Sequence, residues 1–184
     1  LGEAIALRAY IHLDLLRLYA PAPSTHPTNV YIPYVDIYPS YISNRKTVEE
    51  CLSLFIRDLK EAQSIMQIVD KNSGYSTSSR FENIASGEER FLNSRGYRMN
   101  YYAIVAALAR VYYWEGEYEL AYKEAKEVVE ATYPYGSKPE SCFNFVEYSS
   151  LGTNLKDYNS IIMCFFNKTL QEDYIPYITR GNQT

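Results

Sequence analysis

The chain has 184 residues, a formal net charge of −4 and a sequence pI of about 5.3. This length suits one domain with a real hydrophobic core. Acidic and basic residues are interspersed, whereas nucleic-acid-binding proteins usually concentrate basic residues on one face, so we expect no nucleic-acid partner. The longest apolar run, residues 161–166, is far shorter than the ~18 residues that a membrane-spanning helix needs.

Tyrosine is unusually frequent, with 20 residues against one tryptophan. Its ring has an apolar face and a hydroxyl group, which suits both packed helix seams and binding surfaces exposed to water. The three cysteines, Cys51, Cys142 and Cys164, are far apart and odd in number, so they predict neither a disulfide framework nor a metal site. Cys51 lies on the apolar face of a predicted helix, and we interpret it as a buried hydrophobic residue.

Residues 3–19 predict the first helix, because alanine, leucine and arginine favour helix and no glycine or proline interrupts them. Its polar residues are scattered around the helix, which predicts contacts on more than one side, with the charges paired or at the rim. Pro21 ends the helix. Residues 20–46 then form a long connection with five prolines, and its aromatic content favours an ordered loop that covers the domain.

A second helix is predicted over residues 47–69. Thr47 and Glu50 have the spacing of a capping box, in which each side chain accepts a hydrogen bond from the other residue's backbone. The residues that follow form one apolar face and one charged face, and Arg57 and Glu61 lie four residues apart on the charged face. This is the most clearly one-faced helix of the chain.

Residues 98–134 predict two helices joined by a turn at 115–117. Arg110 is the only charged residue from 101 to 114, so the first of these helices must be covered on nearly every side. The second has apolar or small residues near i, i+3, i+4 spacing and charged residues elsewhere, so it is an outer helix with one face in water. We therefore assign Arg110 and Trp114 to the supporting helices and expect ligand contacts in the loops.

The remaining segments are less regular. Residues 70–96 are polar, and we expect a short helix at 79–93. After residue 134 we expect a turn at 135–138, one helical turn at 139–145, a loop at 148–159 and a short extended segment at 160–166.

The hairpin at 98–134 has the residue order of a tetratricopeptide unit. In that design, helix–turn–helix units of about 34 residues stack to share a core. The matching residues are large, small, turn glycine, aromatic, small and small, namely Leu108, Ala109, Gly116, Tyr118, Ala121 and Ala125. The predicted fold is all-α, with tetratricopeptide-like helical hairpins and long ordered loops.

Three segments, taken in order, resemble the SusD/RagB family of outer-membrane nutrient-binding lipoproteins. Residues 2–21 (GEAIALRAYIHLDLLRLYAP) are similar to the family's entry motif. Residues 47–66 are similar to its next segment, with Asp58, Leu59 and Ala62 in place, and residues 98–130 are similar to its helical hairpin. Both order and spacing agree. The chain departs from the family at Ala20, where glycine is frequent.

The resemblance implies a non-catalytic protein on the surface of Bacteroidetes-type bacteria. It implies binding of a glycan or oligosaccharide and its delivery to a SusC-like TonB-dependent outer-membrane transporter, with membrane contact only through a lipid anchor absent from this chain. Residues 1–133 are then the SusD-like tetratricopeptide helical region, and residues 134–184 are the incomplete, loop-rich start of a second part. We expect the chain to be an interior piece of a longer protein, without its signal peptide.

The sequence contains no apparent catalytic constellation, and we predict no enzyme activity, cofactor or metal site. His12 and His26 have no partner at a useful spacing. The adjacent pairs at 49–50 and 88–89 are glutamates, and neighbours on a helix point apart, so we interpret both pairs as solvated. A glycoside hydrolase needs two carboxylates roughly 5–10 Å apart across a cleft, and nothing in the sequence indicates such a pair.

Glycan binding needs flat aromatic faces for the C–H surface of the sugar and amide or charged groups for its hydroxyls. The loop at 20–46 offers both, so the predicted carbohydrate-binding residues are Tyr31, Tyr34, Tyr38, Tyr41 and Asn44. The alternative is that these tyrosines pin the loop to the helices. The alternative function is a tetratricopeptide scaffold that binds a peptide or partner protein, which further regular 34-residue repeats would favour.

Overall fold

The computed structural model describes residues 1–39, 42–71, 80–82, 87, 92–135, 137–145, 149, 158–170, 172 and 175. Within these ranges the protein is mainly helical, as predicted, and none of the helices is long and apolar enough to cross a membrane. The helices are α1 (Gly2–Tyr19), α2 (Val48–Met66), α3 (Tyr101–Glu115) and α4 (Tyr118–Val129). The predicted ranges agree with these bounds to within three residues, except that α4 ends five residues before the end of the hairpin predicted over 98–134.

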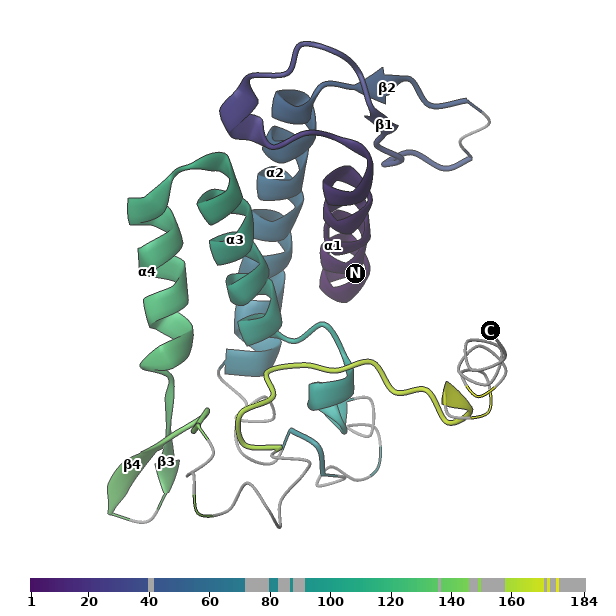
Figure 1. Ribbon diagram of the computed structural model, residues 1–184. Coiled ribbons are helices and arrows are strands. Elements are labelled where there is room, and N and C mark those ends of the chain that lie inside the picture. Colours follow the sequence, from purple (N-terminus) through teal and green to yellow (C-terminus); the bar gives the residue numbers. More distant parts are fainter. Residues whose placement is uncertain are drawn as a thin grey trace, which may run out of the picture.

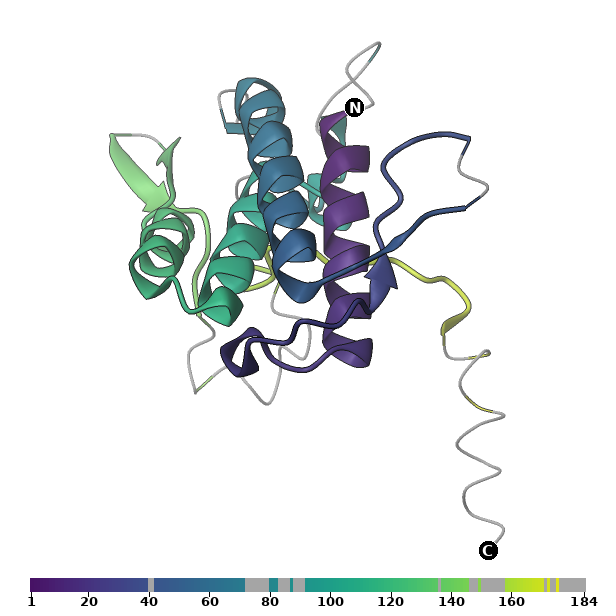
Figure 2. The same cartoon turned by 90° about the horizontal axis from the view of Figure 1, so that it is seen from above.

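The four helices lie side by side in chain order, so that α2 lies between α1 and α3 (Figure 1), and the view from above shows the same arrangement (Figure 2). Most of the core is formed by apolar side chains from α1, α2 and α3, including Leu13, Leu16, Phe55, Leu59, Ile104 and Leu108. Gly2 packs so closely on Met66 of α2 that a Cβ atom there would lie 2.9 Å from the Met66 side chain. Such contact places the start of α1 directly on the end of α2.

Local signals in the sequence set the ends of α2 and α3. The predicted capping box is present, with the Thr47 backbone donating to Glu50 at 2.8 Å and the Glu50 backbone donating to Thr47 at 3.2 Å. α2 continues into a π-helical turn, η2 (Gln67–Lys71). The Asn100 side chain caps α3 by accepting from the Ala103 backbone at 3.0 Å.

The hairpin of α3 and α4 has the predicted inner and outer members. Gly116 ends α3 with φ of +97°, a left-handed conformation that glycine adopts without steric cost. α3 is buried along most of its length, whereas only Ala121 and Val128 of α4 are buried. Charges on α1 are paired, as predicted: Glu3 contacts Arg98 at 2.9 Å.

Two small antiparallel pairs were not predicted. β1 (Ile32–Pro33) pairs with β2 (Arg45–Lys46) inside the long connection. β3 (Thr132–Tyr135) pairs with β4 (Lys138–Ser141), where the sequence predicted a turn followed by a helical turn. The prediction of a helical turn over 139–145 was therefore wrong at its start, because strand pairing across the turn outweighs local helical preference. A short 3₁₀ turn, η1 (Pro23–Thr25), lies earlier in the connection.

The segment at 158–164 lies beside the helices because a buried arginine holds it. Arg80 donates to the carbonyl oxygens of Ile161 at 2.8 Å, Tyr158 at 2.6 Å and Cys142 at 3.1 Å. A second short turn, η4 (Arg95–Tyr97), accepts from the Cys164 backbone at 2.9 Å through Gly96. The backbone of the predicted extended segment therefore bonds to the Arg80 side chain and to Gly96, and the segment does not form a strand.

Other predictions for the irregular regions fall largely outside the described residues. Most residues of the expected helix at 79–93 and of the expected loop at 148–159 lie outside the described ranges. The described residues 80–82 form a turn. The proposed domain boundary at 133/134 falls inside β3, and it stays a prediction.

Candidate functional site

The structure describes four of the five predicted carbohydrate-binding residues, and their environments differ. Tyr34 is only 3% exposed, and Tyr31 is half-buried with its backbone donating to Lys46 at 2.9 Å. Tyr38 is 96% exposed on the protruding part of the loop, and Asn44 is exposed nearby in sequence. Tyr41 lies outside the described residues. Tyr34 thus serves the alternative that we weighed, which is to pin the loop, whereas Tyr38 has a ring that a ligand can reach.

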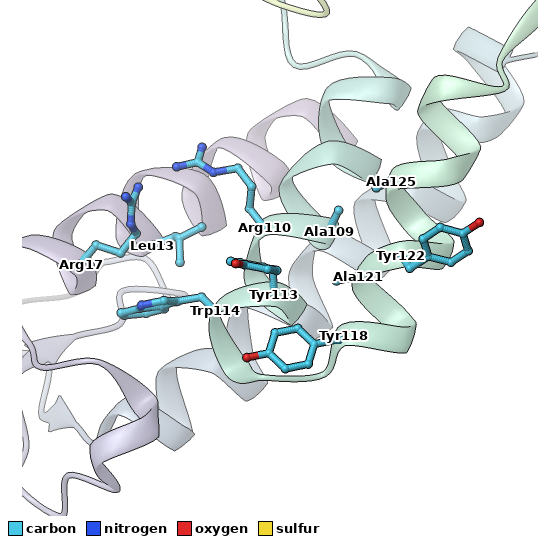
Figure 3. A pocket seen from close by; sticks show the side chains of 10 residues that line it. All are labelled: Leu13, Arg17, Ala109, Arg110, Tyr113, Trp114, Tyr118, Ala121, Tyr122 and Ala125. Atoms are coloured by element: carbon cyan, nitrogen blue, oxygen red, sulfur yellow. The ribbon is translucent and has the colours of Figure 1, made fainter.

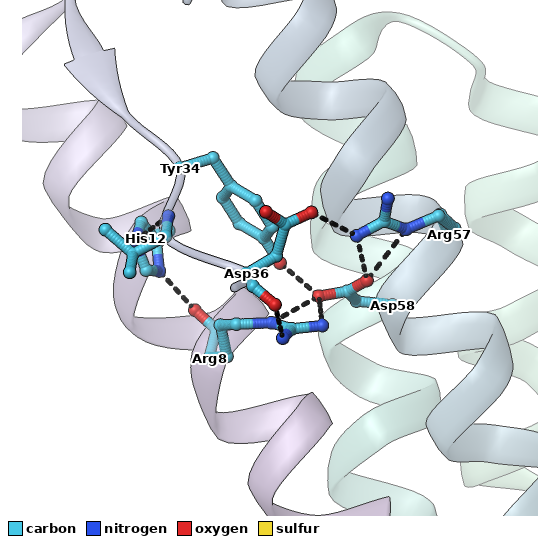
Figure 4. Close-up of polar contacts among 7 residues, drawn as sticks. Arg8, His12, Tyr34, Asp36, Arg57 and Asp58 are labelled. Carbon is cyan, nitrogen blue, oxygen red and sulfur yellow. Dashed lines mark hydrogen bonds and ion pairs between the residues drawn. The ribbon is translucent and has the colours of Figure 1, made fainter. Parts of the chain in front are cut away.

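Tyr34 belongs to a polar group, the Asp58 cluster, formed by Arg8, His12, Tyr34, Asp36, Arg57 and Asp58 (Figure 4). The buried Asp58 carboxylate accepts hydrogen bonds from Arg8 at 2.7 Å, from Arg57 at 2.9 Å and from the Tyr34 hydroxyl. Arg57 also contacts Asp36 of the loop at 3.1 Å. The cluster therefore joins α1, α2 and the loop at one point.

His12 completes the cluster from α1. Its Nδ1 lies 2.8 Å from the Arg8 carbonyl oxygen, and its Nε2 accepts from the Val35 backbone at 3.3 Å. The imidazole ring also packs against the Tyr34 ring, with their centroids 4.6 Å apart. His12 is thus a packed helix residue that holds the loop.

The charges of the Asp58 cluster support one another. Burial by itself would raise the pKa of Asp58, but hydrogen bonds from Tyr34, Arg57 and Arg8 hold that pKa below its ordinary value. Burial and the hydrogen bond to Asp58 raise the pKa of Tyr34, so its hydroxyl remains a protonated donor. The two pKa shifts are those expected of a stable hydrogen-bonded junction, in which the polar groups of the cluster bond to one another.

A different region offers open space. A groove of about 590 Å³ lies between α1, α3 and α4 (Figure 3), and ligand pockets typically enclose roughly 300–1,000 Å³. We call it the aromatic groove. It is lined by Leu13, Arg17, Ala109, Arg110, Tyr113, Trp114, Tyr118, Ala121, Tyr122 and Ala125.

Aromatic side chains form much of the wall of the aromatic groove. Tyr113, Tyr118 and Tyr122 are 68%, 64% and 63% exposed, which is unusual for rings of this size. The Tyr113 and Tyr118 rings contact each other, with centroids 5.6 Å apart. Trp114 is half-buried and packs against the core while it lines the groove. The small side chains at 109, 121 and 125 leave the space between these rings open.

Two arginines lie at the end of the aromatic groove next to α1. The guanidinium groups of Arg17 and Arg110 approach the Asp14 carboxylate at 3.5 Å and 3.8 Å, distances longer than the 2.7–3.2 Å or so of an ordinary N–H···O hydrogen bond. All three side chains are close to half exposed. Arg110 also lies over the Tyr10 ring, 5.7 Å from its centroid. The groove therefore has a basic end and an aromatic end, and Figure 3 shows Tyr122 away from the arginines.

The sequence did not indicate this groove. We assigned Arg110 and Trp114 to the supporting helices, and the structure shows that they also line the open space. Tyr113 and Tyr118 flank the turn at 115–117, and this spacing was a usable signal, because the two helices of a hairpin bring residues beside their turn close together. Arg17 lines the groove only because α1 packs near α3, and local sequence patterns do not predict that packing.

The candidate metal-binding side chains are not grouped into a site among the described residues. Among the described residues, no three His, Cys, Asp or Glu side chains are grouped so that they could hold a metal ion. Glu49 lies on α2 and the pair at 88–89 lies outside the described residues.

No family model and no curated protein matches the sequence. Among solved structures, a SusD superfamily protein from Bacteroides thetaiotaomicron is 22% identical with a TM-score of 0.55, over 83% of this chain and 27% of that chain. The chain has a SusD-like fold. A proposed sugar-binding protein from Bacteroides vulgatus is 25% identical with a TM-score of 0.44, over 68% of this chain and 24% of that chain. The first of these structures confirms the SusD-like fold predicted from three segments. The chain spans about a quarter of the length of both proteins.

Proposed function

We propose that this SusD-like chain binds an oligosaccharide in the aromatic groove without cleaving it. The observation that carries the proposal is the set of three tyrosine rings, each more than 60% exposed, around an open space of about 590 Å³. A sugar ring has apolar C–H faces that pack on such rings, while its hydroxyls hydrogen-bond with tyrosine hydroxyls and guanidinium groups. A pocket with aromatic walls and a few polar groups provides both kinds of contact.

The lining of the groove also supports binding without hydrolysis. Glycoside hydrolysis uses two carboxyl groups that flank the scissile bond. Among the described residues that line the aromatic groove, none carries a carboxylate, and Asp14 lies beside it as the partner of two arginines. This lining therefore supports the proposal of binding without hydrolysis.

The fold and the sequence resemblance together support a proposal for the cellular role. We propose that the full-length protein is held at the cell surface by a lipid anchor in the outer membrane and delivers its ligand to a SusC-like TonB-dependent transporter. The three ordered segments and the fold of a Bacteroides SusD superfamily protein support this role. An open groove suits it, because a delivery protein must release its ligand unchanged.

Isothermal titration calorimetry with a panel of neutral and acidic oligosaccharides tests the proposed function. The double variant Tyr113→Ala/Tyr118→Ala removes two exposed rings, so we expect about tenfold weaker binding or more, as for hot-spot aromatic residues, with an unchanged melting temperature. If the wild-type protein binds no oligosaccharide, or if the double variant binds as tightly as the wild type, the proposal for this groove is wrong.

The control is Tyr38→Ala, which removes a ring outside the groove that is 96% exposed. We expect no loss of oligosaccharide binding from it. A loss at Tyr38 with none at Tyr113 and Tyr118 would instead place the ligand on the loop, where the sequence predicted it.

A tetratricopeptide scaffold that binds a peptide is the second candidate. The small residues Ala109, Ala121 and Ala125 favour it, because they let a peptide backbone approach the helices closely. Oligosaccharide and peptide libraries tested against the same wild-type protein distinguish the two functions. A peptide that binds and whose affinity falls in Tyr113→Ala/Tyr118→Ala, with no oligosaccharide bound, would favour the scaffold.

A further inference from the structure

Charge is distributed unevenly along the aromatic groove. Arg17 reaches it from α1 and Arg110 from α3, so two residues 93 positions apart place their guanidinium groups at the same end (Figure 3). The opposite end carries Tyr118 and Tyr122 of α4, which are uncharged. Lys126 also lies near this end, with its Nζ 5.9 Å from the centroid of the Tyr122 ring, and it is paired with Glu130 at 3.6 Å. Among the residues that line the groove, the positive charges therefore lie at the end next to α1.

Asp14 only partly neutralises the basic end. One carboxylate faces two guanidinium groups, so the three side chains together carry a net charge of +1. Its distances of 3.5 Å and 3.8 Å are too long for strong hydrogen bonds. Each guanidinium group has five N–H donors in a planar fork, which leaves most of them directed elsewhere than at Asp14.

The surroundings favour an anion over a neutral hydroxyl at this position. Guanidinium groups bind carboxylate and sulfate oxygens through paired, charge-assisted hydrogen bonds, which are about twice as strong as neutral ones. Both arginine side chains are close to half exposed, so a ligand can reach them without first burying a charge. The cation–π contact with Tyr10 orients Arg110 without using its N–H donors.

We propose that the aromatic groove is selective for acidic oligosaccharides, whose carboxylate or sulfate group contacts Arg17 and Arg110 while the uncharged face of the neighbouring sugars packs on Tyr113, Tyr118 and Tyr122. This inference rests on the proposed function, and it adds the chemical class of the ligand. It also assigns Asp14 a role, which is to compete with the ligand's anion for the two arginines.

The test compares ligands that differ only in charge. Calorimetry measures the binding of an oligogalacturonide and of its methyl ester, which has the same sugars without the carboxylates. We expect the acid to bind about tenfold more tightly, the effect of one charge-assisted hydrogen bond at a partly exposed site. Added NaCl is expected to weaken binding of the acid much more than binding of the ester. A sulfated galactan oligosaccharide and its desulfated form repeat the comparison, and the two pairs show which anion is preferred.

Three variants assign the effect to named residues. Arg110→Gln and Arg17→Gln are expected to lower the affinity for the acid toward that of the ester, and Asp14→Asn is expected to raise it by removing the competing carboxylate. Lys138→Gln removes one positive charge from an exposed position on β4, outside the groove, and serves as the control. Thermal unfolding checks that each variant is folded.

The outcomes separate this inference from the proposed function. If the acid and its ester bind equally, and the double variant Tyr113→Ala/Tyr118→Ala loses both, the selectivity is wrong and the oligosaccharide groove stands. An equal loss from Lys138→Gln and Arg110→Gln would also overturn the inference, because it would reflect net charge alone. If no oligosaccharide of any charge binds, the proposed function itself fails.

Discussion

Two aspartates of this chain each lie between two arginines, and their surroundings differ. Asp58 is completely buried, and Arg8 and Arg57 donate to it at 2.7 Å and 2.9 Å. Asp14 is 44% exposed, and its two arginines in the aromatic groove approach only to 3.5 Å and 3.8 Å. The same three groups therefore form a tight junction in one place and a loose, accessible one in the other.

The difference shows how one residue combination serves two purposes. A buried carboxylate must keep its partners, because an unpaired charge in the interior is very costly. An exposed carboxylate gains little from its arginines, since water and salt screen the attraction. The buried junction therefore holds the loop on the helices, whereas the exposed one leaves guanidinium donors available to a ligand.

The largest predicted effect is on stability, from removing each aspartate in turn. Asp58→Ala leaves two arginines and the Tyr34 hydroxyl without their acceptor, so we expect the free energy of unfolding to fall by about 3 kcal/mol. Asp14→Ala is the matched control, and we expect a change of roughly 0–1 kcal/mol because its ion pairs are exposed. Urea unfolding followed by circular dichroism measures both. Similar losses in the two variants would show that burial does not distinguish the two junctions.

Low pH is expected to destabilise the protein by protonating Asp58 in the buried junction. The pKa of Asp58 is lowered below its ordinary value of 3.8 in the folded protein. A carboxylate with a lowered pKa contributes stability above its unfolded pKa, and that contribution is lost as the pH falls through the folded value. We therefore expect wild-type stability to fall below about pH 4.

Asp58→Asn identifies the part of the acid effect that belongs to this residue. The variant lacks the titrating group, so its stability is expected to be lower than that of the wild type at neutral pH and to approach it as the pH falls. Melting temperatures measured across this range provide the comparison. A constant difference between the two proteins at every pH would contradict the assignment.

A smaller effect is expected from a single hydroxyl. Tyr34→Phe removes the donor to Asp58 but keeps the ring, and hydrogen bonds to charged groups contribute roughly 1.5 kcal/mol or more. Tyr118→Phe is the matched control, because its side chain is 64% exposed, and we expect almost no change. Urea unfolding of the two variants measures the difference. Equal stability of Tyr34→Phe and the wild type would mean that the buried hydroxyl is dispensable.

The helices could be predicted from the sequence because their signals are local. The capping box at Thr47 and Glu50, the glycine at 116 and the apolar spacing on α2 and α4 all act within a few residues. The resulting bounds, and the inner and outer members of the hairpin, agree with the structure. The resemblance over three segments added the SusD-like fold, which local spacing alone does not specify.

Contacts between distant segments were harder to predict. Arg57 was noted beside Glu61, four residues along its own helix, and in the structure it contacts Asp36 of the loop and the neighbouring Asp58. The β3–β4 pair was predicted as a turn and a helical turn, because strands depend on their partner more than on their own residues. The aromatic groove combines α1 with α3 and α4, so its basic end appears only after the helices are packed.

The smallest expected effect on stability concerns Tyr38, which tests whether the loop or the groove contacts the ligand. Tyr38 is 96% exposed, so Tyr38→Ala is expected to change stability by less than about 0.5 kcal/mol, as for most surface substitutions. Because it lies outside the aromatic groove, we also expect the oligosaccharide affinity to stay unchanged. Calorimetry of Tyr122→Ala, which removes a ring inside the groove that is 63% exposed, provides the comparison. A loss of affinity in Tyr38→Ala alone would support the loop tyrosines predicted from the sequence, and a loss in both variants would mean that one ligand contacts both surfaces.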